Sequence, residues 1–166
     1  MNLTRKDNKG FSLVELIIVI AIMAVLVGVL APAYLRYVEK SRKSADVQAV
    51  DAVMSAMEAA AIDPSLNVAD GTYMKVQLVN SRPSAATDFI YSADSNAKVG
   101  NELWETIGAY QLKSQDWKKI IIQGTVTGGQ VTFEFSQDAP QNKGLLDYAP
   151  DLNLKENSSI TMNQNP

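Results

Sequence analysis

The chain has 166 residues, which leaves room for one modest domain and a separate N-terminal segment. It contains no Cys and no His, which excludes disulfides, thiolate metal sites and histidine-based catalysis. The net charge of -3 disfavours broad electrostatic binding of nucleic acid, although a local basic patch remains open. Because a catalyst would depend on carboxylates, Lys, Tyr or Ser alone, we expect a non-enzymatic chain without a cofactor.

An apolar stretch from Leu16 to Leu35 contains no charged residue. At about 1.5 Å of helical rise per residue, such a stretch matches the hydrocarbon thickness of a bilayer. It shows no polar face, unlike an ordinary core helix, so the pattern predicts a membrane-spanning helix. Charge does not fix its orientation, because basic residues lie on both sides: Arg5, Lys6 and Lys9 before it, and Arg36, Lys40, Arg42 and Lys43 after it.

Glu15 lies at the start of this apolar stretch, where an ionised carboxylate in lipid is costly without a partner. One explanation is that Glu15 sits in the headgroup region, at a helix N-terminus whose dipole favours negative charge. The other is a partner charge supplied by another chain.

The residues around Glu15 read KGFSLVEL from position 9 to position 16. With the apolar run behind them, they resemble the processing motif of type IV pilins and type II secretion pseudopilins. The shared parts are a short basic leader, a glycine before the cut, a phenylalanine after it and a glutamate four residues beyond. The resemblance implies that a membrane peptidase removes residues 1–10 by cutting between Gly10 and Phe11 and that Phe11 becomes N-methylated.

The same resemblance implies that Glu15 attracts the free Phe11 amine of a neighbouring subunit. Residues 11–35 would be the membrane anchor first and the filament core later, with the head domain, residues 36–166, outside the cytoplasmic membrane and then on an extracellular filament. The implied partners are identical subunits, the prepilin peptidase and methylase, and an assembly platform with an ATPase, since no nucleotide-binding motif is present. The side chains expected to pack in the filament core are Leu13, Leu16, Ile17, Ile20, Met23, Val27 and Leu30.

Several alternatives remain open. A secretion pseudopilin or a competence pseudopilin carries the same processing motif as a pilus subunit. In another class, Ala31-Pro32-Ala33 resembles a signal peptidase site, which would release a soluble protein beginning at Tyr34. The apolar run exceeds the usual length of the apolar region of a signal sequence, which argues against that cut. An uncleaved anchor holding an extracellular domain is the third.

Beyond Pro32 an apolar stripe at three- and four-residue steps continues the helical pattern. One helix is therefore predicted from about Ser12 to Ile62, ended by Asp63-Pro64. Gly28 and Pro32 weaken the helix, so we expect a kink or local melting there. For the basic residues in its second half, a solvated face with support from Glu39 to Lys43 is expected. The alternatives are contacts with anionic lipid before assembly or with acidic residues of a neighbouring subunit afterwards.

The remaining elements predict an α+β class, in which the amphipathic half of the long helix packs on a small antiparallel β-sheet while the apolar half protrudes. This layout is similar to the pilin fold. The clearest signal is a hairpin around Gly128-Gly129, with apolar alternation in its second strand. Trp104 and Trp117 are expected to pack in the core. The predicted elements are a strand at Tyr73–Val79, a helix at Asn101–Leu112, the hairpin strands Lys119–Val126 and Gln130–Ser136, and a last strand near Ser158–Met162.

The segment from Gln137 to Asn157 is rich in Asp, Asn, Pro and Lys and predicts a surface loop. Asp138, Asp147 and Asp151 are weak calcium candidates, by resemblance to a carboxyl-terminal loop of major pseudopilins. Their spacing fits no compact site for a hard cation, so we expect no metal.

Overall fold

The computed structural model describes residues 11–81, 90–92, 97–108 and 110–162. The chain divides into two compact units, Met1–Val38 and Glu39–Pro166. One helix, α1, runs over Leu13–Ile62 and belongs to both. The predicted long helix is confirmed, and it ends where expected, with the Asp63 carboxylate accepting the backbone N–H of Ser65 at 2.7 Å.

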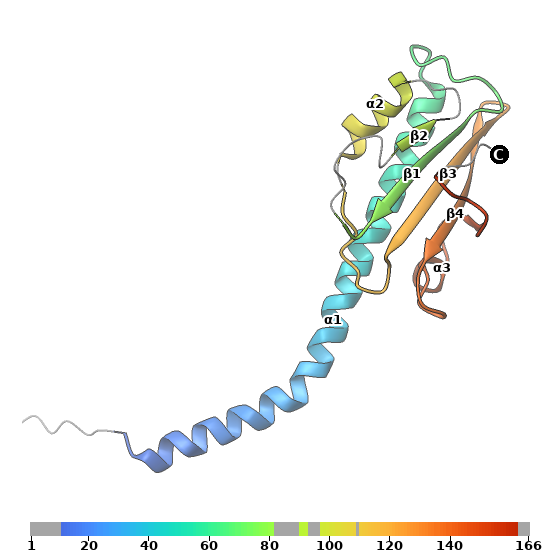
Figure 1. Cartoon of the computed structure of the whole chain (residues 1–166). Helices are drawn as coiled ribbons and strands as arrows, with labels where there is room; N and C mark the ends of the chain where they lie inside the picture. Colours follow the sequence, from blue (N-terminus) through green and yellow to red (C-terminus); the bar gives the residue numbers. More distant parts are fainter. Residues whose placement is uncertain (1–10, 82–89, 93–96, 109, 163–166) are drawn as a thin grey trace, which may run out of the picture. The chain divides into compact units, whose positions relative to one another are not determined.

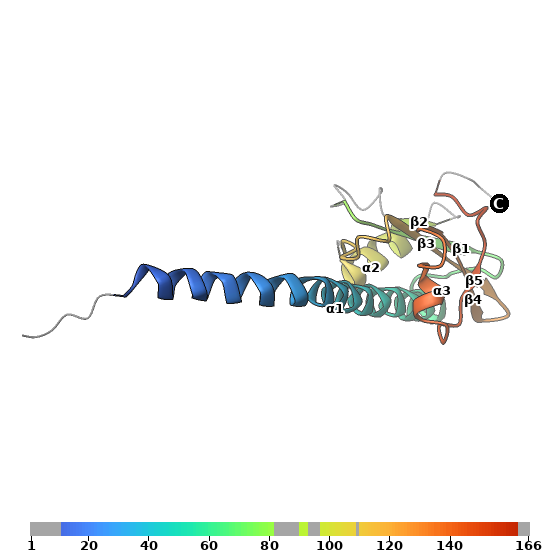
Figure 2. The ribbon, with the colours of Figure 1, turned by 90° about the horizontal axis from the view of Figure 1, so that it is seen from below.

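In the second unit α1 is amphipathic, because one face packs on a sheet and the other meets solvent. Figures 1 and 2 both show this half of α1 running along one face of the sheet, with α2 beside it. Burial at three- and four-residue steps fits the predicted stripe. The buried positions of α1 are Asp46, Val50, Val53, Met54, Ala56, Met57 and Ala60.

The sheet has the strand order β2-β1-β3-β4-β5 within the described residues. Neighbouring strands are antiparallel except β4 and β5, which are parallel. The α+β class is thus confirmed, and the predicted sheet is antiparallel with one short exception. Its strands are β1 at Tyr73–Val79, β2 at Ile90–Ser92, β3 at Lys119–Thr127, β4 at Gln130–Asp138 and β5 at Lys155–Glu156.

The predicted hairpin joins β3 and β4. Gly128 and Gly129 have φ angles of 59° and 76°, so both central residues adopt the left-handed conformation of a two-residue turn that suits the twist of the strands. The side chain of Asp70 also accepts the backbone N–H of Gly128 at 2.6 Å. The helix-facing side of the sheet forms the core together with α1, through Met74, Val76, Leu78, Ile120, Ile122, Phe133 and Phe135.

The second helix, α2, occupies Ala97–Ile107 rather than the predicted Asn101–Leu112. Gly108, with φ of 67°, ends it, and its backbone N–H reaches the carbonyl of Trp104 at 2.8 Å. The predicted helix is therefore right in kind and displaced along the chain. Leu103 is fully buried and Trp104 packs against the core, as expected.

The predicted strand at Ser158–Met162 is wrong, and the last strand is β5. Asn157 donates its backbone N–H to the carbonyl of Phe135 at 2.7 Å, and a turn from Asn157 to Ile160 then takes the chain out of the ladder. Ile160, only 6% exposed, covers the face of the sheet opposite α1, where Lys75 donates to the carbonyl of Thr161.

The segment Gln137–Asn157 is only partly the surface loop that its polar composition predicts. It contains a short helix, α3, at Leu145–Tyr148, and the Leu145 side chain is fully buried in the main core. The indole N–H of buried Trp117 donates to the carbonyl of Lys143 at 2.7 Å. The prediction was wrong around α3 because this segment is packed against the core.

Candidate functional site

The N-terminus of α1 is capped by side chains at the start of the helix. The carboxylate of Glu15 accepts the backbone N–H of Ser12 at 2.8 Å, and the Ser12 hydroxyl oxygen lies 3.3 Å from the backbone N–H of Val14. Serine before the helix and glutamate three residues later are the residues of a capping box, here with the serine hydroxyl accepting from the second rather than the third helical residue. Glu15 is thereby fixed at the helix N-terminus, where the helix dipole favours a negative charge.

Glu15 uses only its Oε2 atom in this cap. Its Oε1 atom makes no hydrogen bond within the part of the chain that the structure describes. An ionised carboxylate has room for several donors, so a cation arriving at this end of the helix can bind without breaking the cap.

The side chains that follow Glu15 are apolar and exposed on every side of the helix. Phe11 is 88% exposed, and the large apolar residues from Leu13 to Leu35 are each more than half exposed. The same holds for the predicted filament-core residues Leu13, Leu16, Ile17, Ile20, Met23, Val27 and Leu30. An apolar surface of this extent needs lipid or another protein around it. By length and composition, α1 is the one helix among the described residues that can cross a membrane.

Helix α1 continues without a break across Gly28 and Pro32. The melted alternative is therefore not the conformation of this chain, and the kink stays a prediction. Gly28 has no atom within 4 Å of the position of an added Cβ, so no close packing within the chain requires a glycine there.

The calcium candidates do not form a cation site. No group of three or more acidic side chains is close enough to hold a metal ion among the described residues. Asp147 caps α3 instead, by accepting the backbone N–H of Gly144 at 2.9 Å. Asp138 and Asp151 are exposed.

Two carboxylates of α1 hold the loop that follows α2. Fully buried Asp46 accepts the Tyr110 hydroxyl at 2.8 Å and the backbone N–H groups of Lys113 and Ser114 at 2.9 and 2.8 Å. Seven residues earlier, Glu39 accepts the Ser114 hydroxyl at 2.6 Å. Burial, followed by the bond to Asp46, raises the pKa of Tyr110 above its ordinary range.

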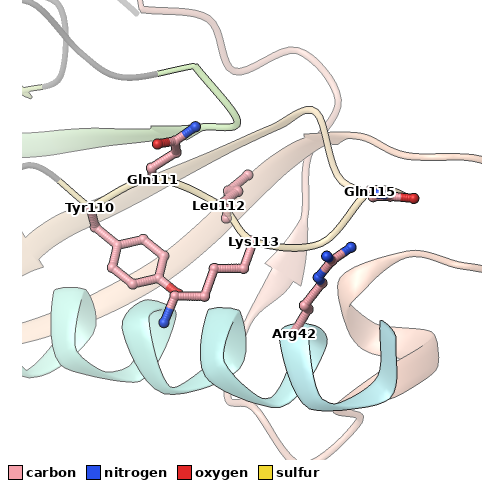
Figure 3. A pocket seen from close by; sticks show the side chains of 6 residues that line it. All are labelled: Arg42, Tyr110, Gln111, Leu112, Lys113 and Gln115. Atoms are coloured by element: carbon pink, nitrogen blue, oxygen red, sulfur yellow. The ribbon is translucent and has the colours of Figure 1, made fainter. Parts of the chain in front are cut away.

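Sequence reasoning missed this clamp, the set of hydrogen bonds by which Asp46 and Glu39 hold the loop. The available signal was a carboxylate, Asp46, directly before Val47 of the apolar stripe. Figure 3 shows Tyr110 and Lys113 reaching from the loop toward α1 and Arg42 rising from α1 toward the loop, around a pocket of about 660 Å³.

The expected support from Glu39 to Lys43 is wrong. Glu39 lies 3.7 Å from Arg42, whereas the Lys43 ammonium lies 2.7 Å from Asp116 and 5.5 Å from the centre of the Trp117 ring. Because Asp116 follows the clamped loop, Lys43 turns toward the domain rather than along the helix surface. Of the basic residues just beyond the apolar stretch, Lys43 therefore makes its contacts within the folded domain.

Comparison with known proteins bears on the N-terminal segment first. Residues 5–31 match the family described as the prokaryotic N-terminal methylation motif. The chain is also 26% identical over 135 residues to the fimbrial protein EcpC of Eikenella corrodens, an alignment that covers 81% of this chain and 86% of that protein. The chain is thus similar to pilin-type proteins in its N-terminal segment and, at low identity, over most of its length. No solved structure gives a significant match.

The resemblance to type IV pilins and pseudopilins is therefore confirmed. The matched segment spans the predicted cleavage point, Glu15 and most of the apolar stretch. Gly10 lies outside the described residues, so the structure places only the Phe11 side of the predicted cut. The roles of Gly10, Phe11 and Glu15 stay predictions.

Proposed function

We propose that this chain is a structural subunit of a type IV pilus-like filament. A prepilin peptidase removes residues 1–10 and methylates Phe11, the apolar helix holds the subunit in the cytoplasmic membrane with its head outside, and an ATPase-driven platform then polymerises identical copies. The observation that carries the proposal is the placement of Glu15, a carboxylate fixed at the end of a helix that exposes apolar side chains on every side.

The apolar half of α1 suits both proposed states of the subunit, in the membrane and in the filament. Burying one large apolar side chain is worth about 1.5–3 kcal/mol relative to water, so this half of the helix does not stay in water. Lipid tails are about as apolar as neighbouring side chains, and exchanging one for the other changes the hydrophobic free energy little. Polar contacts can therefore decide whether, and in which register, subunits leave the membrane.

Glu15 provides such a contact. Cleavage before Phe11 creates a new α-amino group, and an amine of a neighbouring copy can donate to the free Oε1 atom of Glu15. Close opposite charges in apolar surroundings offset part of their desolvation, and a wrong register would leave the carboxylate unpaired.

Intact-mass analysis and N-terminal sequencing of protein from sheared cell-surface material test the processing. A methylated N-terminus at Phe11 is the expected result. A chain starting at Tyr34 would show ordinary secretion, and a chain retaining Met1 would show an uncleaved anchor. Either would overturn the proposal.

Two substitutions separate the charge of Glu15 from its cap. Glu15→Gln keeps an oxygen that can accept the Ser12 N–H but removes the negative charge. Ser12→Ala removes the capping hydroxyl and keeps the charge. We expect both variants to be inserted and processed, with sheared filament lost from Glu15→Gln and retained in Ser12→Ala. Normal filament yield from Glu15→Gln would refute the pairing with Phe11.

The similarity to a fimbrial protein favours a surface fimbria over a secretion or competence pseudopilus. Electron microscopy of cells lacking the chain checks this choice. Loss of surface fibres is expected, whereas intact fibres with defective protein secretion or DNA uptake would assign the chain to a pseudopilus.

A further inference from the structure

A groove runs along the end of α1 in the unit Glu39–Pro166. It has a volume of about 950 Å³ and lies between the last turns of α1, the start of β4 and the segment leading into β5. Its apolar floor and wall include Ala59, Ile62, Val131, Phe133 and Leu154.

Ile62 distinguishes this groove from the rest of the unit. It is 73% exposed, and it is the one large apolar side chain that is mainly exposed across the described residues from 39 to 162. Every other large apolar residue of this unit for which burial is described is at least partly covered. An exposed apolar residue at the mouth of a groove is typical of a surface that another molecule covers.

One acidic side chain of the groove, Glu58, is exposed and has no charged partner in the described part of the chain. Glu134, which also lines the groove, accepts the Asn157 side-chain amide at 2.8 Å, and its partner in the strand register is the cation Lys155, another lining residue. Glu58 is left as the uncompensated charge beside Ile62.

A segment of the same chain has the complementary chemistry. Leu35 and Tyr37 are 66% and 72% exposed, and the exposed cations Arg36 and Lys40 make no ion pair with any residue that the structure describes. Both stretches belong to one unbroken helix, α1, and two separated stretches of a helix cannot fold back on each other. Only a second copy can bring them together.

We propose that the groove of one subunit receives residues Leu35–Lys40 of a second, displaced copy, with Arg36 paired to Glu58 and Tyr37 packed on Ala59 and Ile62. This contact rests on the proposed polymerisation and adds a second register determinant to the one at Glu15. Arg36 suits the role because a guanidinium binds a carboxylate through two parallel hydrogen bonds. The exposed Tyr37 ring supplies apolar area at low entropic cost.

Charge exchange tests the pair in cells that assemble the wild-type chain. Glu58→Lys and Arg36→Glu each place like charges together, and we expect sheared filament to fall by roughly tenfold in each. The double variant restores the attraction with reversed signs and is expected to recover most of the yield. Asp51→Lys is the matched control, because Asp51 is also an exposed acidic residue of α1 and does not line the groove. We expect normal filament from it.

Disulfide trapping gives an independent readout, since the chain has no cysteine of its own. A Tyr37→Cys and Ala59→Cys double variant is expected to form a ladder of cross-linked subunits in oxidised filaments, and neither single variant is. Wild-type yields from both charge variants, or a double charge variant no better than its parents, would overturn this contact while leaving the proposed function intact. A wild-type chain that forms no filament would overturn both.

Discussion

Asp46→Ala is the substitution we expect to destabilise the head most sharply through polar contacts. The side chain is fully buried and accepts three donors: one hydroxyl, from Tyr110, and two backbone N–H groups, from Lys113 and Ser114. Removing it leaves those donors facing an apolar helix without their acceptor. Ser114 is only 2% exposed, so water does not readily replace the carboxylate there.

The magnitude follows from the cost of unsatisfied groups. A hydrogen bond to a charged group contributes about 1.5–3 kcal/mol, and the three bonds are not additive. Alanine regains roughly 0.5 kcal/mol as the better helix former. We expect a net loss of about 3–5 kcal/mol in the free energy of unfolding, near the value for breaking a buried charged network.

Urea unfolding of the detergent-solubilised chain measures this loss through tryptophan fluorescence, because Trp117 is fully buried in the same unit. Asp51→Ala is the matched control. It makes the same change on the same helix at an exposed position, and we expect it to stay within about 0.5 kcal/mol of wild type. Equal stabilities of Asp46→Ala and Asp51→Ala would refute the clamp.

The loss of stability at alkaline pH gives a second test of the contact between Asp46 and Tyr110. Tyr110 has a raised pKa in the fold, so its contribution is fully present below the unfolded pKa of about 10 and is lost as the pH rises above it. Without Asp46 the folded pKa moves back toward the ordinary value. The alkaline decline should therefore be shallower in Asp46→Ala than in wild type.

Three further changes test the head. Leu145→Ala should lower the free energy of unfolding, measured with urea, by about 2–4 kcal/mol, since this side chain is fully buried in the core. A loss below about 1 kcal/mol would contradict the packing of α3 against the core. The bond from Lys43 lowers the pKa of Asp116, so this pair stabilises the fold above the ordinary carboxyl pKa and the stabilisation is lost as the pH falls below it. Asp116→Asn should therefore make the loss of stability at acid pH shallower. An unchanged acid dependence would contradict the pairing. Gly124→Ala should cost about 1–3 kcal/mol, because its Cβ would lie 3.0 Å from Val131 and 3.1 Å from the Met57 sulfur; a stabilised variant would show that these side chains yield freely.

The elements that sequence predicts well are those whose own residues determine them. Strand β1 begins and ends as predicted, and the β3–β4 hairpin follows from two glycines that permit the left-handed turn. The cap between Ser12 and Glu15 was not predicted, although a serine and a glutamate three residues apart are its local signal. The displaced α2 also had a usable local signal, since Gly108 was the natural stop.

The elements that sequence misses depend on distant partners. Strand β5 consists of Lys155 and Glu156, which have no β-pattern and form a strand only because β4 offers an edge. Helix α3 lies in a polar segment and is held by the burial of Leu145 and by the Tyr148 hydroxyl, which donates to the carbonyl of Lys40. The clamp at Asp46 joins residues more than sixty positions apart, a pairing that no local pattern contains.

The cap on α1 has a consequence for the order of events during maturation. Every atom of the Ser12–Glu15 cap lies on the retained side of the predicted cut, so excision of the leader takes away no hydrogen bond that closes the helix. The N-terminal cap of the helix is formed by retained residues alone. If a peptidase cuts before Phe11 as proposed, the cap of α1 is already formed before the cut and needs no rearrangement after it.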